Sequence, residues 1–456
     1  MRVHSSPVGV SPRRRPTGVT PAQVVALGFL AAIAVCTLLL ALPISHSGEV
    51  EVSMLTAAFT AVSAVCVTGH IVVDTATAWS PFGQAVIVAF IQIGGLGIML
   101  VASLIGLVLA RKLSLRGRMF ASTENRAITT GDAGRLARGI VLTTVIIEAA
   151  VALSLTLWFW LHYGVHPVEA LGRGVFLAIS SFNNAGFAPF SDNMIGFATD
   201  PAVLLPMCLA TILGGLGFPV LLQLRRELRR PLHWTMNTNL VLTMTVLLLV
   251  IGTAVIAVFE WSNAATMGSM NPAEKLLVAF FHSVQSRTAG FNSVDIGQMT
   301  SESWLVIDVL MFIGGGPAGT AGGIKVTTFA VLLFIIITEL RGEGAVNIFG
   351  KRLSRAVHRE AITITLLSLA AVMSSTIALM VITHLDLDVL LFEAVSAFGT
   401  VGLSTGITSS LPPAGQLILM VLMFLGRLGP LTLGTALVLR QRRVLYELPK
   451  ERPVIG

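Results

Sequence analysis

The chain is rich in apolar residues and poor in charged ones. Of its 456 residues, 54% are hydrophobic and 12% are charged, whereas a soluble globular protein carries about 25% charged residues. So few polar side chains cannot cover a soluble surface, and disordered chains are poor in apolar residues. The composition therefore excludes a soluble or a disordered protein and predicts an all-α polytopic membrane protein.

The net charge of +7 comes from basic residues that cluster at the ends of apolar runs. Most of the 30 Lys and Arg residues lie in five segments, 1–18, 111–138, 225–230, 341–359 and 440–452. Basic residues accumulate in cytoplasmic loops of membrane proteins, so we expect these segments at the cytoplasmic face and infer no nucleic-acid partner. The segments expected outside are acidic, which would concentrate cations near an entrance; membrane topology alone explains the basic loops equally well.

The apolar runs predict eight membrane spans, because a spanning helix needs about 20 mostly apolar residues. The runs lie near residues 22–43, 82–110, 139–161, 201–224, 238–259, 303–338, 361–383 and 414–439. An even number of spans places both termini on one side of the membrane. We therefore expect both termini in the cytoplasm.

Four shorter, semi-polar stretches alternate with these spans and repeat one pattern, a phenylalanine ten residues before a glycine. The pairs are Phe59 and Gly69, Phe176 and Gly186, Phe280 and Gly290, and Phe392 and Gly402. About eight residues of helix rise only about 12 Å, so each stretch must enter the membrane and turn back. Non-helical backbone at membrane depth is buried in protein or lines a water-filled path. Four re-entrant pore helices around one pseudo-fourfold axis predict an ion-selectivity filter.

The span after each re-entrant stretch carries a glycine-rich motif. The motifs are IGGLG at 93–97, LGGLG at 213–217, IGGGP at 313–317 and LGRLG at 425–429. In the first two copies we expect the glycines to serve close helix packing. The third copy continues to residue 325 with six Gly and one Pro, which disfavour helix by about 1 and 3 kcal/mol each. It predicts a broken, mobile segment halfway through the span. Residues 314–319 also match G-x-G-x-x-G, but no βαβ unit surrounds them, so we reject dinucleotide binding there.

This pattern divides the chain into four span–pore helix–span repeats. The expected divisions are a cytoplasmic tail (1–18), pore repeat 1 (19–112), a cytoplasmic loop (113–138), pore repeat 2 (139–230), pore repeat 3 (231–340), a cytoplasmic loop (341–358), pore repeat 4 (359–440) and a cytoplasmic C-terminal tail (441–456).

Over about residues 20–440 the chain resembles the Trk/Ktr/HKT superfamily of potassium transporters. The residues that carry the resemblance are VSAVCVTG (62–69), SFNNAGF (181–187), SRTAGF (286–291), GGPAGTAGGIK (315–325), FEAVSAFGTVGLSTG (392–406) and GRLGPLT (426–432). Trk-type members have two extra spans before the first repeat, whereas here the first span leads straight into the first filter. The chain therefore looks most like the membrane subunit of a bacterial Ktr-type uptake system.

The resemblance implies a filter that binds K⁺ through backbone carbonyl groups. The implied filter residues are Val67, Thr68, Gly69, Asn184, Ala185, Gly186, Thr288, Ala289, Gly290, Thr400, Val401 and Gly402. In the family, glycine in the first filter is associated with K⁺ and serine with Na⁺ permeation, so we expect K⁺. His70 departs from the pattern, because a larger apolar residue is usual there.

The resemblance also implies that an intramembrane loop below the filter gates the pore. The implied gate residues are Gly314, Gly315, Gly316, Gly319, Gly322, Gly323, Lys325 and Arg427. A structural alternative for Arg427 is the capping of carbonyl groups of a neighbouring helix. We expect Arg287 and Glu393 to support the filter through a buried salt bridge and Lys325 to reach the cytoplasm. Glu148 and Asp308 have no evident partner.

The sequence holds no nucleotide-binding domain, so we expect no cofactor in this chain, with K⁺ as the transported ion. The resemblance implies a homodimer in the bacterial cytoplasmic membrane, in contact with lipid. It also implies cytoplasmic RCK regulatory subunits of the KtrA type, which would carry the nucleotide. Their expected docking surface comprises residues 111–138 and 339–360.

Three other functions are alternatives to potassium uptake. One is a sodium-permeable or Na⁺-coupled transporter of the same fold. Another is a secondary transporter that rocks two halves, since such folds also show broken helices and repeats; four like-oriented copies favour a pore. An enzyme would need clustered His, Asp or Glu at membrane depth, whereas the nine His are scattered, so we expect no enzymatic activity.

Overall fold

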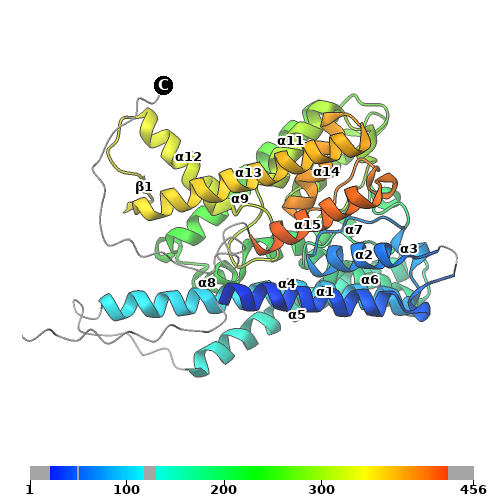
Figure 1. The fold of residues 1–456 in the computed structure, drawn as a ribbon, viewed down its shortest axis with the longest axis horizontal. Coiled ribbons are helices and arrows are strands. Elements are labelled where there is room, and N and C mark those ends of the chain that lie inside the picture. Colours follow the sequence, from blue (N-terminus) through cyan, green and yellow to red (C-terminus); the bar gives the residue numbers. More distant parts are fainter. Residues whose placement is uncertain (1–20, 49–50, 118–129, 430–456) are drawn as a thin grey trace, which may run out of the picture.

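The computed structural model describes residues 21–48, 51–117 and 130–429, and its architecture is almost entirely helical (Figure 1). The longer helices are α1 (Pro21–Leu40), α4 (Pro81–Gly117), α5 (Thr130–Leu161), α7 (Pro201–Leu216), α8 (Phe218–Glu227), α9 (Met236–Glu260), α11 (Ser301–Phe312), α12 (Val326–Leu340), α13 (Arg355–Thr383) and α15 (Pro413–Leu428). The shorter helices between them are α2 (Met54–Val65), α3 (Thr75–Ala78), α6 (Pro167–Phe182), α10 (Pro272–Gln285) and α14 (Leu387–Gly399).

Short turns and one hairpin complete the described structure. The 3₁₀ turns are η1 (Pro43–Ser45), η2 (Ile195–Phe197), η3 (Pro231–His233), η4 (Ile296–Gln298) and η5 (Thr408–Ser410). The strands β1 (Asn347–Ile348) and β2 (Lys351–Arg352) pair antiparallel. This hairpin and the C-terminal end of α4 lie at the same end of the molecule (Figure 1).

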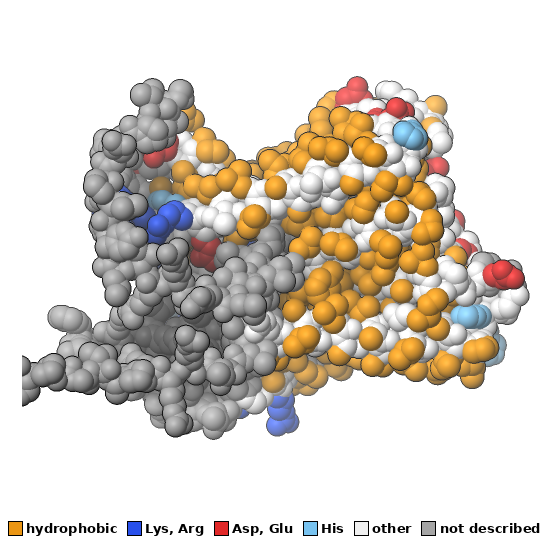
Figure 2. All heavy atoms as spheres, viewed as in Figure 1, with side chains coloured by type: hydrophobic (Ala, Val, Ile, Leu, Met, Phe, Trp, Pro, Cys, Tyr) orange, Lys and Arg blue, Asp and Glu red, His pale blue; other side chains and the backbone are white. Residues whose placement is uncertain are grey.

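Helix length and composition identify a multi-pass membrane protein. Among the described residues, α1, α4, α5, α9 and α13 are long and apolar enough to cross a membrane, and α7 with α8 would be a sixth span. In the view of Figure 2, hydrophobic side chains form a broad band, with Asp and Glu side chains gathered at one end of it. Such a band is the surface that a bilayer covers.

Two apolar runs are interrupted in the structure. The run expected near 201–224 is broken, because α7 and α8 meet at Gly217 with a bend of 101°. Gly217 has φ of 90°, which is incompatible with continued helix. The break expected in the span over 303–338 is confirmed, since α11 ends at Phe312 and α12 begins at Val326.

Other expected segments lie wholly or partly outside the described residues. These are the tails 1–18 and 441–456, the central part of the loop 113–138, and the end of the run 414–439 beyond residue 429. The loop between α4 and α5 is shorter than the expected 113–138, because α4 extends to Gly117 and α5 begins at Thr130.

The four short helices that precede the repeated glycines pack in similar surroundings. α2 packs against α1 and α4, α6 against α5 and α7, and α14 against α13 and α15, whereas α10 packs against α9 and α7. In addition, α4 contacts α6, α7 contacts α10, α11 contacts α14, and α15 contacts α2. Each helix that follows a short helix therefore touches the next short helix along the chain, and the last touches the first.

Candidate ion pathway

The four repeated glycines meet in a closed ring. Each has positive φ, with values of 90° at Gly69, 71° at Gly186, 75° at Gly290 and 93° at Gly402. A Cβ atom added at any of them would overlap a backbone oxygen of the next turn. The oxygens belong in order to Ala185, Ala289, Val401 and Thr68. The last contact returns to the first turn, so four turns from one chain enclose a single centre that only glycine fits.

The residue two positions before each glycine is also left-handed. The values of φ are 56° at Val67, 60° at Asn184, 75° at Thr288 and 50° at Thr400. Left-handed backbone is uncommon for residues other than glycine, above all for a β-branched one. Such strain persists only where the surrounding structure imposes it, and it concentrates at functional sites. The same costly backbone shape occurs four times around one ring.

Serine side chains brace three of these turns. The hydroxyl of Ser63 accepts a hydrogen bond from the Gly69 amide (3.0 Å), and that of Ser396 accepts one from the Gly402 amide (3.1 Å). Ser180 occupies the matching position and donates to the Phe187 oxygen (2.8 Å). These serines were not among the predicted site residues, although they share one column of the repeat and the sequence therefore carried a signal for them.

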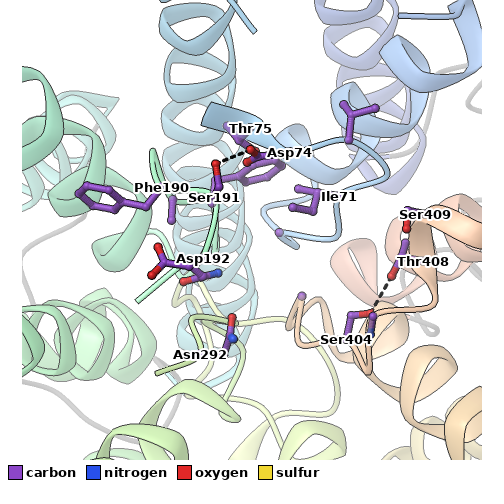
Figure 3. Close-up of a pocket in the computed structure, with 18 of the residues that line it drawn as sticks. Ile71, Asp74, Thr75, Phe190, Ser191, Asp192, Asn292, Ser404, Thr408 and Ser409 are labelled. Atoms are coloured by element: carbon purple, nitrogen blue, oxygen red, sulfur yellow. Dashed lines mark hydrogen bonds between the residues drawn. The ribbon is translucent and has the colours of Figure 1, made fainter. Parts of the chain in front are cut away.

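One side of the ring opens into a cavity of about 340 Å³. Three of the ring glycines, Gly69, Gly186 and Gly402, line it together with residues that follow them in the chain. Its wall also carries the carboxyl groups of Asp74 and Asp192 (Figure 3). Asp74 accepts a hydrogen bond from Ser191 (2.6 Å), which joins the walls contributed by the first two repeats. A cation approaching the ring from this side meets carboxylates first.

The segment 313–325 lies against the opposite side of the ring, where the short helices end. The hydroxyl of Thr320 is hydrogen-bonded to the Phe182 oxygen (3.2 Å) and to the side-chain amide of Asn184 (2.9 Å). At the other end of the segment, a Cβ on Gly322 would overlap the hydroxyl of Thr400. The segment therefore touches residues of the second and fourth turns directly.

Backbone hydrogen bonds fold this segment back on itself and attach it to the bend after α7. Gly314 donates to Ile324 (2.9 Å), and Gly315 accepts from Val326 (2.9 Å), so both ends of the segment meet. Gly316 donates to Gly215 (2.7 Å). The remaining predicted glycines lie at close backbone approaches, Gly319 beside Gly214 and Gly217, and Gly323 beside Phe312 and Gly399. The glycines thus allow the segment to fit between helix ends.

Arg427 joins this segment to the first repeat. Its guanidinium donates one hydrogen bond to the Thr320 oxygen and another to the Gly94 oxygen (3.2 Å). The side chain is 3% exposed. Both descriptions drawn from the sequence fit this geometry, because Arg427 contacts the loop and also binds a carbonyl group of the neighbouring helix α4.

Comparison with known proteins places the chain in a family. The model of the TrkH cation transport proteins matches residues 19–444. The chain belongs to the TrkH family of cation transport proteins. The resemblance inferred from the filter and loop motifs is therefore confirmed.

Relatives of this TrkH-family chain cover nearly its whole length. It is 40% identical to Ktr system potassium uptake protein B of Bacillus subtilis, over 91% of this chain and 92% of the relative. It is 37% identical to the Vibrio alginolyticus protein of the same name, over 95% and 94% of the two chains. The crystal structure of the potassium transporter TrkH from Vibrio parahaemolyticus matches its fold with a TM-score of 0.74, at 18% identity, over 94% of this chain and 86% of that chain.

The salt bridge expected between Arg287 and Glu393 is not formed between these two described residues. Arg287 donates to the backbone oxygens of Gly314 (3.1 Å) and Thr245 (3.4 Å). Depth explains the error. Arg287 lies three residues before its ring glycine and Glu393 nine before its own, and six residues of helix rise about 9 Å. Arg287 instead fastens the inner end of α10 to the loop 313–325.

Lys325 is also placed differently from our expectation. Its ammonium donates to the Ala321 oxygen inside the loop, and its side chain is half-buried. It was expected to reach toward the cytoplasm, and this was wrong. The free carbonyl groups of a non-helical loop provide a nearer acceptor.

Glu148 has partners that the sequence did not reveal. Its carboxylate accepts hydrogen bonds from Asn183 (3.0 Å) and Gln92 (3.1 Å), and Asn183 also donates to Gln92 (2.7 Å). Asn183 directly precedes the second turn, in the position that Arg287 holds before the third. The network therefore attaches the second turn to α4 and α5. Asp308 is 7% exposed, and its Oδ1 has no hydrogen-bond partner in the described part of the chain.

The glycine motifs of the first two following helices serve close packing, as expected. A Cβ on Gly94 would overlap the Val65 oxygen, and one on Gly214 would overlap the Phe182 oxygen. Gly426 meets the Phe398 oxygen in the same way. Each of these oxygens lies four residues before a ring glycine, so the motif brings each helix against the inner end of its own short helix.

Proposed function

We propose that the chain carries potassium ions into a bacterial cell through the ring of four glycine turns. The closed ring is the observation that carries this proposal. Four turns of identical handedness place backbone carbonyl groups around one centre, where they can replace the hydration shell of a cation. The names of the relatives from Bacillus subtilis and Vibrio alginolyticus supply the ion, potassium, and the direction, uptake.

The architecture that we propose has eight spans and four re-entrant pore helices around a pseudo-fourfold pore. Support comes from the repeated packing of α2, α6, α10 and α14 and from the cyclic contacts between each following helix and the next pore helix. Both termini would be cytoplasmic. In agreement with this, the end of α4 and the basic hairpin at 347–352 share one end of the molecule (Figure 1), which the charge pattern assigns to the cytoplasm.

In this pore the three residues that end at each ring glycine form the filter, and K⁺ binds their backbone carbonyl groups. The loop 313–325, with Arg427, is the gate. It lies on the cytoplasmic side of the ring, and its contacts with Thr400 and Asn184 close that side. Opening the path requires Thr320 of the loop to leave Phe182 and Asn184, so the hydrogen bonds of Thr320 set the stability of the closed state.

The assembly that we propose is a homodimer in the cytoplasmic membrane, bound on its inner face by RCK subunits that carry the nucleotide. The relatives are named as proteins of a Ktr system, which supports further components. The hairpin at 347–352 offers a docking point, because Phe349 is half-exposed between Ile348 and the basic residues of β2. The hairpin follows α12, so a partner bound there would act on the helix that continues from the gate loop.

Uptake of rubidium-86 into proteoliposomes tests the proposal. With K⁺ inside and tracer outside, we expect uptake that external K⁺ inhibits strongly and Na⁺ or Li⁺ weakly. Equal inhibition by Na⁺ would favour the sodium-permeable alternative. Flux that saturates as the gradient rises, and that requires a counter-ion, would favour the rocking transporter.

A further inference from the structure

His70 directly follows the ring glycine of the first turn, and its side chain points away from the cavity. The residue is 1% exposed and is absent from the cavity wall, although Gly69 and Ile71 on either side line it. Its burial therefore reflects contacts within the wall.

The contacts of His70 are with the fourth repeat. Its Nδ1 lies 3.5 Å from the Glu393 carboxylate and 3.4 Å from the Thr408 hydroxyl. Thr408 donates to Glu393 (3.0 Å) and lies 2.9 Å from Ser404 (Figure 3). A carboxylate offers hydrogen-bond acceptors only. Nδ1 of His70 can therefore donate to Glu393 when it carries the proton of the imidazole ring.

Glu393 holds the loop that leaves the fourth turn. It accepts hydrogen bonds from the Ser404 hydroxyl and from the Thr405 amide (3.2 Å). It is 0% exposed, and a buried carboxylate with several donors fixes the backbone that supplies them. His70 is therefore joined, through one carboxylate, to the residues two and three positions after Gly402.

This contact spans the junction where the ring closes. The fourth turn meets the first at Gly402 and Thr68, which come from opposite ends of the chain. On the loop side of the ring, Arg427 crosses the same junction to reach Gly94. On the cavity side, the described residue that crosses it with a side-chain contact to Glu393 is His70. Arg427 and His70 therefore connect the first and fourth repeats on opposite sides of the ring.

We propose that His70 is a selectivity-determining positioning residue, which fixes the spacing between the first and fourth filter turns by holding Glu393 and Thr408. A filter distinguishes cations by the spacing and number of its carbonyl groups. Loosening one of the four contacts between adjacent turns widens the ring on one side. A wider ring lowers the preference for K⁺ over Na⁺. The inference rests on the proposed potassium pathway and adds a residue to it.

Two substitutions of similar size separate this role from simple packing. His70→Asn keeps a hydrogen-bonding amide near the place of Nδ1, whereas His70→Leu fills the space without a polar atom. Glu393→Gln tests the partner. His46→Leu is a matched control, because His46 bonds the Leu40 oxygen (2.9 Å) away from the ring.

The K⁺/Na⁺ permeability ratio in proteoliposomes is the measurement, with size-exclusion chromatography to establish assembly. We expect His70→Leu to lower the ratio by about fivefold, the scale of one lost hydrogen bond, and His70→Asn and His46→Leu to keep it within about twofold. Glu393→Gln should lower the ratio, and its effect should not add to that of His70→Leu. If His70→Leu does not assemble, the difference in permeability ratio between Glu393→Gln and His70→Asn tests the same role.

The outcomes distinguish this inference from the proposed function. A wild-type protein that does not conduct K⁺ overturns the potassium pathway itself. A selective wild type whose ratio is unchanged in His70→Leu and Glu393→Gln overturns the role of His70 alone. Equal loss of K⁺ and Na⁺ flux, with no rescue by asparagine, assigns His70 to packing and also overturns the inference.

Discussion

The guanidinium of Arg427 and the backbone oxygen of Thr320 are hydrogen-bonded inside the membrane-spanning part of the protein. This bond joins α15, the last described helix, to the loop that interrupts the span between α11 and α12. Since Arg427 also binds Gly94 of α4, one side chain connects three repeats just beneath the ring.

Replacing Arg427 by alanine should therefore raise K⁺ flux. Hydrogen bonds made by a charged group contribute about 1.5–3 kcal/mol, so the open population of the loop should rise about tenfold. Selectivity should stay within about twofold of wild type, because Arg427 binds the loop and α4 on the far side of the ring and its loss leaves the contact between His70 and Glu393 in place. Dependence on a regulatory partner should weaken. Tracer flux with and without the partner measures this. Arg173→Ala, which removes a half-buried arginine paired with Glu169, is the control. Unchanged flux in Arg427→Ala would leave Arg427 with a structural role.

Thr320→Val should have a smaller effect in the same direction. The variant keeps the shape and the backbone but loses the hydroxyl contacts to Phe182 and Asn184. At about 1 kcal/mol for a neutral hydrogen bond, we expect flux to increase a few-fold. Thr320→Ser restores the hydroxyl and should return flux to the wild-type level. Flux below wild type in the valine variant would mean that these bonds hold the path open.

Gly69→Ser should shift selectivity from K⁺ toward Na⁺. Any Cβ at this position overlaps the Ala185 oxygen of the neighbouring turn, so the turn must move and the carbonyl groups must move with it. We expect the K⁺/Na⁺ ratio to fall by about tenfold, equivalent to about 1.4 kcal/mol. Gly406→Ser is a matched control, because Gly406 also has positive φ, of 99°, but open space around it. Equal ratios in both variants would remove residue 69 from the filter.

Substitution of Glu148 should affect stability. Glu148→Leu removes the acceptor of the Gln92 amide and one of the acceptors of the Asn183 amide, and a buried unsatisfied group costs about 1–3 kcal/mol. We expect a lower Tm in detergent and a milder effect for Glu148→Gln. Asp308→Asn offers a contrast, since the Oδ1 atom of Asp308 makes no hydrogen bond in the described part of the chain, and its Tm should not fall. A similar Tm for all three variants would show that the Glu148 network does not support the fold.

Cysteine labelling tests the topology. The native Cys36, Cys66 and Cys208 are buried, so background labelling should be low. A membrane-impermeant thiol reagent added outside cells should label Ile195→Cys, since Ile195 is 40% exposed at the acidic end. It should not label Phe349→Cys, which is 50% exposed in the hairpin, until the membrane is opened. The reverse pattern would invert the proposed orientation.

The sequence by itself determined the class of protein, the four glycine turns and the broken third repeat. These features depend on composition and on local backbone chemistry. A run of apolar residues specifies a membrane helix wherever it packs, and six glycines with a proline prevent one. The same local reasoning identified Arg427, because a charge within an apolar run must find a partner.

Only the tertiary structure decided which residues are partners. Arg287 follows the end of α10 and Glu393 lies within α14, so they sit at different depths in neighbouring repeats and the pairing inferred from charge alone was wrong. Glu393 instead meets His70 from the first repeat, and Glu148 meets Gln92 and Asn183. Long-range contacts of this kind depend on how the helices are rotated and staggered against one another, which a periodic apolar pattern does not specify. The closure of the ring between Gly402 and Thr68 likewise exists only once all four repeats are packed around a common centre.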